Sequence, residues 1–223
     1  MMMAIPMHST QADLEQMITQ QVRTWDVLDT RTLDAMRQVP RERFVPAAWR
    51  SLAYGDCALP LPLGKHMLTP MLAGRMLQAL SLQQGEQALE IGTGSGYLAA
   101  CLAAMGGRVQ SLELHSEIAN LARANLRAAG VDSVEVTTAD GAALVSETAY
   151  DAIVLTASLP IYEPRFERAL KYGGRLFVVV GSAPVMEAKL VRRLGPTEFS
   201  SQLLFETTLE VLEHVPAPPA FRF

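Results

Sequence analysis

The sequence LEIGTGSG at residues 89–96 decides the fold of this chain. Its apolar residues predict a buried strand over residues 87–91, and its glycines predict a tight turn into a helix that begins near Tyr97. Glycines suit such a turn because they adopt positive φ and because a Cβ would block the approach of a ligand. The start of the helix presents unpaired N–H groups. The segment therefore predicts a ligand-binding loop, with an ordinary strand-to-helix turn as the alternative.

A carboxylate at the end of the next apolar segment favours the ligand-binding interpretation. Glu113 lies near the end of an expected strand at residues 109–114, where an acid can accept hydrogen bonds from both hydroxyls of a ribose. The glycines are spaced G-x-G-x-G. A dinucleotide-binding loop has G-x-G-x-x-G and would need glycine where this chain has Tyr97. The spacing therefore does not favour a dinucleotide site.

Strands and helices alternate on either side of this loop. We expect strands at residues 87–91, 109–114, 134–138, 152–156 and 175–180, and helices at 97–105, 116–129 and 163–171. This alternation predicts an α/β fold with a Rossmann-like, doubly wound, mostly parallel sheet and right-handed crossovers. Residues 189–194 and 202–212 predict an antiparallel pair at the sheet edge, which gives seven strands.

The first part of the chain is expected to be a helical extension. Residues 10–50 have helical periodicity, with a second helix that starts near Asp29 and ends at Pro40. Residues 41–63 look irregular, and a further helix starts at Pro70. We therefore divide the chain into an extension at residues 1–69 and a core at residues 70–223. At 223 residues, 49% of them hydrophobic, the two parts are expected to form one compact unit.

Composition argues against several classes of protein. The chain has 19 basic and 23 acidic residues and a net charge of −4, so it lacks the basic excess of proteins that bind nucleic acids or anionic membranes. No apolar run reaches the roughly 18 residues of a membrane span, and the N-terminus does not look like a signal peptide. We expect a cytoplasmic protein. Neither a disulfide nor a metal site is predicted from the spacing of Cys57, Cys101, His8, His66, His115 and His214.

The glycine-rich loop resembles motif I of the class I S-adenosylmethionine-dependent methyltransferases, in which an acid precedes the glycines as Glu90 does here. Two other positions fit a cofactor at the carboxyl ends of the strands. Asp140 is placed to accept the adenine amine, although an Asp-Gly pair is also common in plain turns, and Thr156 reaches the same edge. The resemblance implies a set of cofactor contacts: Glu90, Gly92, Thr93, Gly94, Gly96, Glu113, Leu114, Asp140, Gly141 and Thr156.

A larger part of the chain resembles the protein-L-isoaspartate O-methyltransferase family. The likeness rests on VPRERFVP at residues 39–46, ALPL at 58–61, and residues 64–70 and 153–160, and it covers roughly residues 15–216. It implies methyl transfer from S-adenosyl-L-methionine, with S-adenosyl-L-homocysteine as product, to an isoaspartyl carboxylate in damaged proteins or peptides. A carboxylate with a pKa near ~4 is already ionised at neutral pH, so the reaction needs no strong general base.

The segment at residues 64–70, GKHMLTP, departs from the family pattern, and we call it the lid segment. The family reads G-x-T-x-S-x-P there, and its Ser hydroxyl lies beside the reacting carboxylate. With Gly64 and Pro70 as anchors, His66 takes the Thr position and Leu68 takes the Ser position. Two residues are candidates to replace the missing hydroxyl: Thr69, after a shift of one residue, and His66, which is alternatively a solvated loop residue.

Three functions are compatible with the sequence. The first is a working isoaspartyl methyltransferase. The second is a related methyltransferase with a changed, small-molecule acceptor. The third is a non-catalytic protein that binds S-adenosylmethionine, against which the intact Glu113 and Asp140 argue. The sequence does not indicate the oligomeric state.

Overall fold

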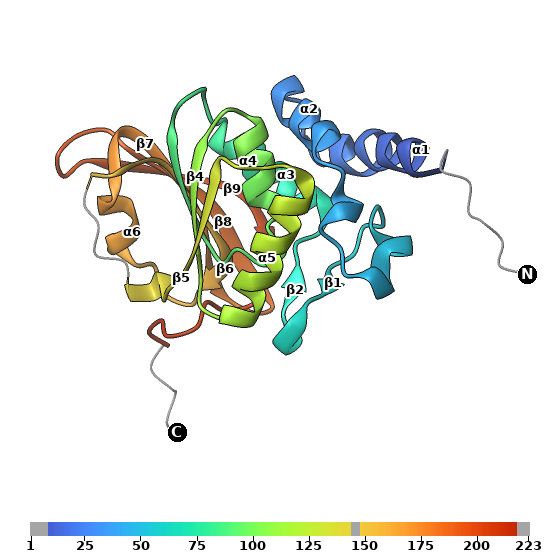
Figure 1. Ribbon diagram of the computed structural model, residues 1–223. Helices are drawn as coiled ribbons and strands as arrows, with labels where there is room; N and C mark the ends of the chain where they lie inside the picture. The colour runs from blue at the N-terminus through green and yellow to red at the C-terminus, as the bar shows by residue number, and fades with distance from the viewer. Residues whose placement is uncertain (1–8, 144–147, 218–223) are drawn as a thin grey trace, which may run out of the picture.

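A seven-stranded sheet forms the centre of the protein (Figure 1). The computed structural model describes residues 9–143 and 148–217. The strand order is β5-β4-β3-β6-β7-β8-β9, parallel from β5 to β7 and antiparallel from β7 to β9. The strands are β3 (Gln87–Ile91), β4 (Arg108–Glu113), β5 (Val134–Thr138), β6 (Tyr150–Leu159), β7 (Leu170–Ser182), β8 (Val185–Arg193) and β9 (Phe199–Thr207). The doubly wound, mostly parallel sheet predicted from the sequence is confirmed.

Helices cover both faces of the sheet, and each face has its own hydrophobic core. On one side lie α3 (Pro70–Leu80), α4 (Tyr97–Ala104) and α5 (Ser116–Ala129), and on the other lies the short α6 (Pro164–Arg168) (Figure 1). Neighbouring side chains of β6 alternate between the two cores: Val154 packs with the first, and Ile153 with the second. Burial on both faces explains why the strands are continuous apolar runs.

The N-terminal segment packs on the side of α3 and α4. It consists of α1 (Ser9–Gln16), the π-helical stretch η1 (Met17–Val22), the 3₁₀ turn η2 (Arg23–Trp25) and α2 (Thr30–Gln38). Asp29 caps α2 as expected, because its side chain accepts the N–H of Thr32. Further short elements follow: η3 (Arg41–Arg43), η4 (Ala47–Leu52), β1 (Leu59–Pro60), η5 (Pro62–Gly64) and β2 (His66–Met67), with β1 and β2 paired antiparallel.

Two expected elements differ from the structure. The helix expected at residues 163–171 ends at Arg168, because the chain enters β7 at Leu170 and pairs there with Tyr150 of β6. The edge pair begins earlier than expected, and its last strand ends at Thr207 rather than at residue 212. Residues 208–213, which we call the C-terminal strap, instead return to β6, where Ser158 N–H donates to the Glu210 carbonyl at 2.8 Å.

None of the helices in the described part of the chain has the length and the apolar character needed to cross a bilayer.

Candidate cofactor and acceptor site

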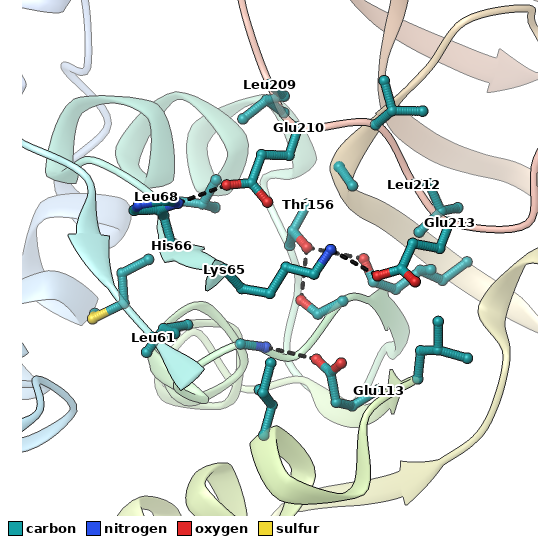
Figure 2. Close-up of a pocket in the computed structure, with 18 of the residues that line it drawn as sticks. Leu61, Lys65, His66, Leu68, Glu113, Thr156, Leu209, Glu210, Leu212 and Glu213 are labelled. Atoms are coloured by element: carbon teal, nitrogen blue, oxygen red, sulfur yellow. Dashed lines mark hydrogen bonds and ion pairs between the residues drawn. The ribbon is translucent and has the colours of Figure 1, made fainter. Parts of the chain in front are cut away.

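A cavity of about 480 Å³ lies at the carboxyl ends of β3, β4 and β6. Its position is the one at which open α/β sheets bind ligands, beside the point where the strand order reverses, and its volume is in the usual range for small-molecule sites. The lid segment and the C-terminal strap form its other walls (Figure 2). The cavity is lined by several residues expected from the sequence: Gly92, Gly94, Glu113, Leu114, Asp140, Gly141, Thr156, His66, Leu68 and Thr69.

The glycine-rich loop needs glycines because of its positive φ angles and, at some positions, because there is no room for a Cβ. Gly92, Gly94 and Gly96 all have positive φ, at 93°, 54° and 86°. A Cβ on Gly92 would collide with the Thr156 hydroxyl, whereas a Cβ on Gly94 would meet only Leu61, at 3.5 Å. Gly94 therefore leaves open space on the cavity side. Gly96 does not line the cavity; it packs against α5.

Glu113 holds its carboxylate against the loop (Figure 2). Its Oε2 accepts the Gly94 N–H at 3.1 Å, and its Oε1 accepts the His115 N–H at 3.1 Å. The side chain is nearly buried, at 6% exposure. Because each carboxylate oxygen has two lone pairs, both retain capacity for a further donor such as a ribose hydroxyl.

Asp140 has the turn role that the sequence left open and also lines the cavity. Its Oδ1 accepts the N–H of Ala142 at 2.9 Å, which is the turn role, and the side chain also lines the cavity. Its Oδ2 lies 2.8 Å from Nδ1 of His214. Gly141 follows in close packing, since a Cβ there would collide with Ile91.

Glu90 and Thr93 lie behind the loop and do not line the main cavity. Glu90 is fully buried, and its Oε2 accepts the Ser111 hydroxyl at 2.5 Å. Thr93 Oγ1 lies 2.5 Å from the same Ser111 oxygen. Burial raises the pKa of Glu90 to about 8, against a smaller opposing effect of the Ser111 hydrogen bond, so this acid is largely protonated at neutral pH.

The lid segment has no hydroxyl at position 68, and its one hydroxyl is that of Thr69. Leu68 lines the cavity with its side chain, and its carbonyl accepts Nη2 of Arg41 at 2.7 Å. Thr69 caps α3, where its Oγ1 accepts the Leu72 N–H at 3.3 Å. His66 is exposed to solvent, and its Nδ1 also lies 2.7 Å from Oε1 of Glu210 in the strap (Figure 2).

The C-terminal strap is the part of the site that sequence reasoning missed. Lys65 Nζ of the lid segment and Nε2 of His115 lie 2.7 and 2.8 Å from Glu213 Oε1. The hydrogen bonds from Lys65 and His115 lower the pKa of Glu213 to about 2. The sequence signal was present as acids at positions 210 and 213 and bases at 65 and 66, but only the fold shows that they meet.

Comparison with known proteins assigns the chain to a family. The model of the protein-L-isoaspartate(D-aspartate) O-methyltransferase family matches residues 12–210. The chain belongs to this family. The family resemblance noted in the sequence is thereby confirmed.

Relatives in this family are similar along most of their length. A protein-L-isoaspartate O-methyltransferase of Koribacter versatilis is 38% identical over 182 residues, which cover 81% of this chain and 82% of the relative. That of Methanoculleus marisnigri is 41% identical over 187 residues, covering 82% and 84%. A provisionally named Plasmodium falciparum family member, solved with S-adenosyl-L-homocysteine, superposes with a TM-score of 0.79 at 20% identity, over 92% of this chain and 98% of that one.

Proposed function

We propose that this protein transfers a methyl group from S-adenosyl-L-methionine to the side-chain carboxylate of isoaspartyl residues in damaged proteins. The family match over residues 12–210 carries this conclusion. Relatives named for the activity are 38–42% identical to this chain. Family membership and the two carboxylates in the cavity, Glu113 and Asp140, argue against a non-catalytic protein.

The residues of the main cavity suit the cofactor. Gly94 leaves open space beside the loop, and Glu113 keeps acceptor capacity next to it. We assign Glu113 to the ribose hydroxyls and Asp140 to the adenine amine, since both residues line this cavity. The bound cofactor supplies an electrophilic methyl group on a sulfonium. The chain itself holds the acceptor beside that group.

Alignment is the main catalytic task, because the acceptor carboxylate is already ionised at neutral pH. Holding two reactants in the attack geometry contributes roughly 7–11 kcal/mol to lowering a barrier. The lid segment and the strap supply this alignment, since Lys65–Glu213 and His66–Glu210 join them across the cavity.

Leu68 is the observation that favours a second candidate function. It places an apolar side chain where the family has a hydroxyl, and further apolar side chains line the same cavity. They are Leu61, Leu72, Leu209 and Leu212. Such a lining fits a small, apolar acceptor in place of an isoaspartyl peptide.

One experiment tests both candidates. The protein is incubated with methyl-labelled cofactor and either an isoaspartyl peptide or its normal aspartyl isomer, and methylation is measured by mass spectrometry. We expect labelling of the isoaspartyl peptide alone. Cofactor binding without labelling of any isoaspartyl peptide would exclude the first function and leave the changed acceptor.

A further inference from the structure

A second, smaller cavity adjoins the main one and is lined by polar groups without partners. Its volume is about 50 Å³, and it lies between the lid segment and the start of α4. The two cavities share wall residues, so they are neighbours: His66, Met67, Leu68, Gly92, Gly94 and Thr156 line both. A water molecule needs about 10–15 Å³ by this measure. The smaller cavity therefore has room for a group of a few heavy atoms.

Arg41 brings a buried positive charge to this cavity. Its side chain is fully buried; Nε donates to the Ala53 carbonyl at 2.9 Å and Nη2 to the Leu68 carbonyl at 2.7 Å. The remaining nitrogen, Nη1, has no hydrogen-bond partner, and among the described residues no carboxylate forms an ion pair with the guanidinium. The π face of Tyr97 lies 5.2 Å away. A buried charge in this state is costly unless a counter-ion joins it.

Two further buried groups line the same cavity without partners in the described structure. They are the Tyr97 hydroxyl and Oε1 of Glu90. Buried polar atoms are nearly always hydrogen-bonded. The Tyr97 hydroxyl has the weakly polar thiol of Cys101 beside it, so the charged Arg41 nitrogen is the group that most requires an explanation. Burial raises the pKa of both Tyr97 and Glu90, which keeps both protonated at neutral pH. A protonated Glu90 has one O–H to donate, and Oε2 already accepts the Ser111 hydroxyl, so we place the proton on Oε1. All three groups are then hydrogen-bond donors.

We propose that the smaller cavity is a carboxylate-binding subsite, in which Arg41 supplies the charged donor and Tyr97 and Glu90 supply neutral ones. The carboxylate belongs to a ligand that occupies the main cavity. Two sources present this group there: the methionine end of the cofactor, and the acceptor carboxylate of the proposed function. The inference rests on that function only for the second source.

The subsite also accounts for the missing hydroxyl of the lid segment. Leu68 lines both cavities and cannot donate a hydrogen bond from its side chain. Arg41 holds the carbonyl of the same residue and presents its free nitrogen next to it. The donors that the lid lacks are therefore supplied from η3 and from α4, behind the lid.

The test combines a residue change with removal of the carboxylate from the ligand. Calorimetry compares S-adenosyl-L-homocysteine with its decarboxylated analogue in the parent protein, in Arg41→Lys and in Tyr97→Phe. If the cofactor supplies the carboxylate, the parent prefers S-adenosyl-L-homocysteine by roughly ten- to a hundred-fold. The ratio of the two affinities is expected to fall toward one in Arg41→Lys and to fall by a smaller factor in Tyr97→Phe. A merely structural role would weaken both ligands equally and leave their ratio unchanged.

The second arm measures the acceptor. If the isoaspartyl carboxylate occupies the subsite, the ligand ratio stays constant, while KM for an isoaspartyl peptide rises roughly ten- to a hundred-fold in Arg41→Lys. Matched controls are Arg31→Lys and Tyr172→Phe. Arg31 also donates to backbone carbonyls, those of Leu82 and Met105, but lines neither cavity, and Tyr172 is exposed. Neither control is expected to change the ratio or KM.

Two results would overturn the proposal. The first is a folded Arg41→Lys variant that keeps the parent's ratio of the two ligand affinities and the parent's KM for the isoaspartyl peptide. If Arg41→Lys does not fold, the same result in a folded Tyr97→Phe variant counts instead. The second applies if the protein methylates no isoaspartyl peptide. The proposed function then fails, and only the comparison of the two cofactor ligands can test the subsite. A parent that binds both ligands equally would exclude the subsite in that case.

Discussion

Glu210 lies 2.7 Å from Nδ1 of His66, although 144 positions separate the two residues in the chain. The pair joins the strap to the lid segment, and Lys65 and Glu213 form a second link of 2.7 Å between the same two segments (Figure 2). The strap and the lid segment, which both line the main cavity, are therefore held together by two polar contacts. We expect these contacts to slow the release of a ligand from the cavity.

Lys65→Met is expected to speed the release of S-adenosyl-L-homocysteine. Methionine keeps an unbranched apolar stem but loses the charge that pairs with Glu213. Because partly exposed ion pairs contribute about 0.2–1 kcal/mol, we expect a dissociation rate up to roughly five times that of the parent, measured by stopped-flow displacement. Lys189→Met is the control, since it removes the pair with Glu187 on β8. The difference should shrink at high salt, and a salt-independent effect would show that packing rather than charge was lost.

Glu113→Ala is expected to weaken cofactor binding. The change removes the acceptor that we assign to the ribose hydroxyls. It also leaves the N–H groups of Gly94 and His115 without their hydrogen-bond acceptor. Such losses cost about 1–3 kcal/mol, which corresponds to roughly five- to 150-fold in Kd by calorimetry. Glu135→Ala, an exposed acid on β5, is the control. Equal affinity in Glu113→Ala and the parent would remove Glu113 from the site.

Glu90 is expected to make the protein less stable as pH rises. Its pKa is about 8 in the folded state and 4.5 as the ordinary value, so between these pH values the folded state binds more protons than the unfolded state. Glu90 has no effect on the pH dependence of the free energy of unfolding below pH 4.5. Between pH 4.5 and 8 it lowers that free energy by up to about 1.4 kcal/mol per pH unit.

Urea unfolding of Glu90→Gln across this pH range checks the expectation. The amide does not ionise, so the variant should lack this part of the pH dependence, and the difference between the two proteins should increase with pH. Parallel curves for parent and variant would show that Glu90 ionises as an exposed acid does.

The sequence predicted the parts of the site that local chemistry determines. Gly92 and Gly94 have the positive φ that the turn pattern requires, and Glu113 ends its strand beside them because parallel strands place their carboxyl ends at one edge. These features follow from the alternation of strands and helices, which the local sequence pattern predicts.

The rest of the site depends on contacts that no local pattern encodes. Apolar periodicity extended the last strand to residue 212, but the chain leaves the sheet at Thr207 and crosses back to Ser158. Likewise, the sequence VPRERFVP was recognisable as a motif, yet nothing in it showed that Arg41 is fully buried against the ring of Tyr97. Packing of distant segments decides both features.

Leu68→Ser is expected to raise the turnover of an isoaspartyl peptide. The parent offers an apolar wall at this position of the cavity, and a hydrogen bond to a charged group is worth about 1.5–3 kcal/mol. Restoring the hydroxyl should therefore increase kcat/KM roughly ten- to a hundred-fold, while cofactor affinity changes little. Leu68→Ala is the matched control, because it opens similar space without adding a donor.

Three outcomes of this comparison have distinct meanings. Faster turnover in Leu68→Ser than in Leu68→Ala assigns the gain to the hydroxyl. Equal, absent turnover in all three proteins, with normal cofactor binding, means that the acceptor has changed. If the parent already turns over as fast as Leu68→Ser, another donor serves the carboxylate. Thr69 lines the same cavity, but its oxygen caps α3. His66→Phe, which removes the pair with Glu210, tests the imidazole, and Arg41→Lys tests the carboxylate-binding subsite proposed above. A loss of turnover in His66→Phe alone would assign that role to the imidazole.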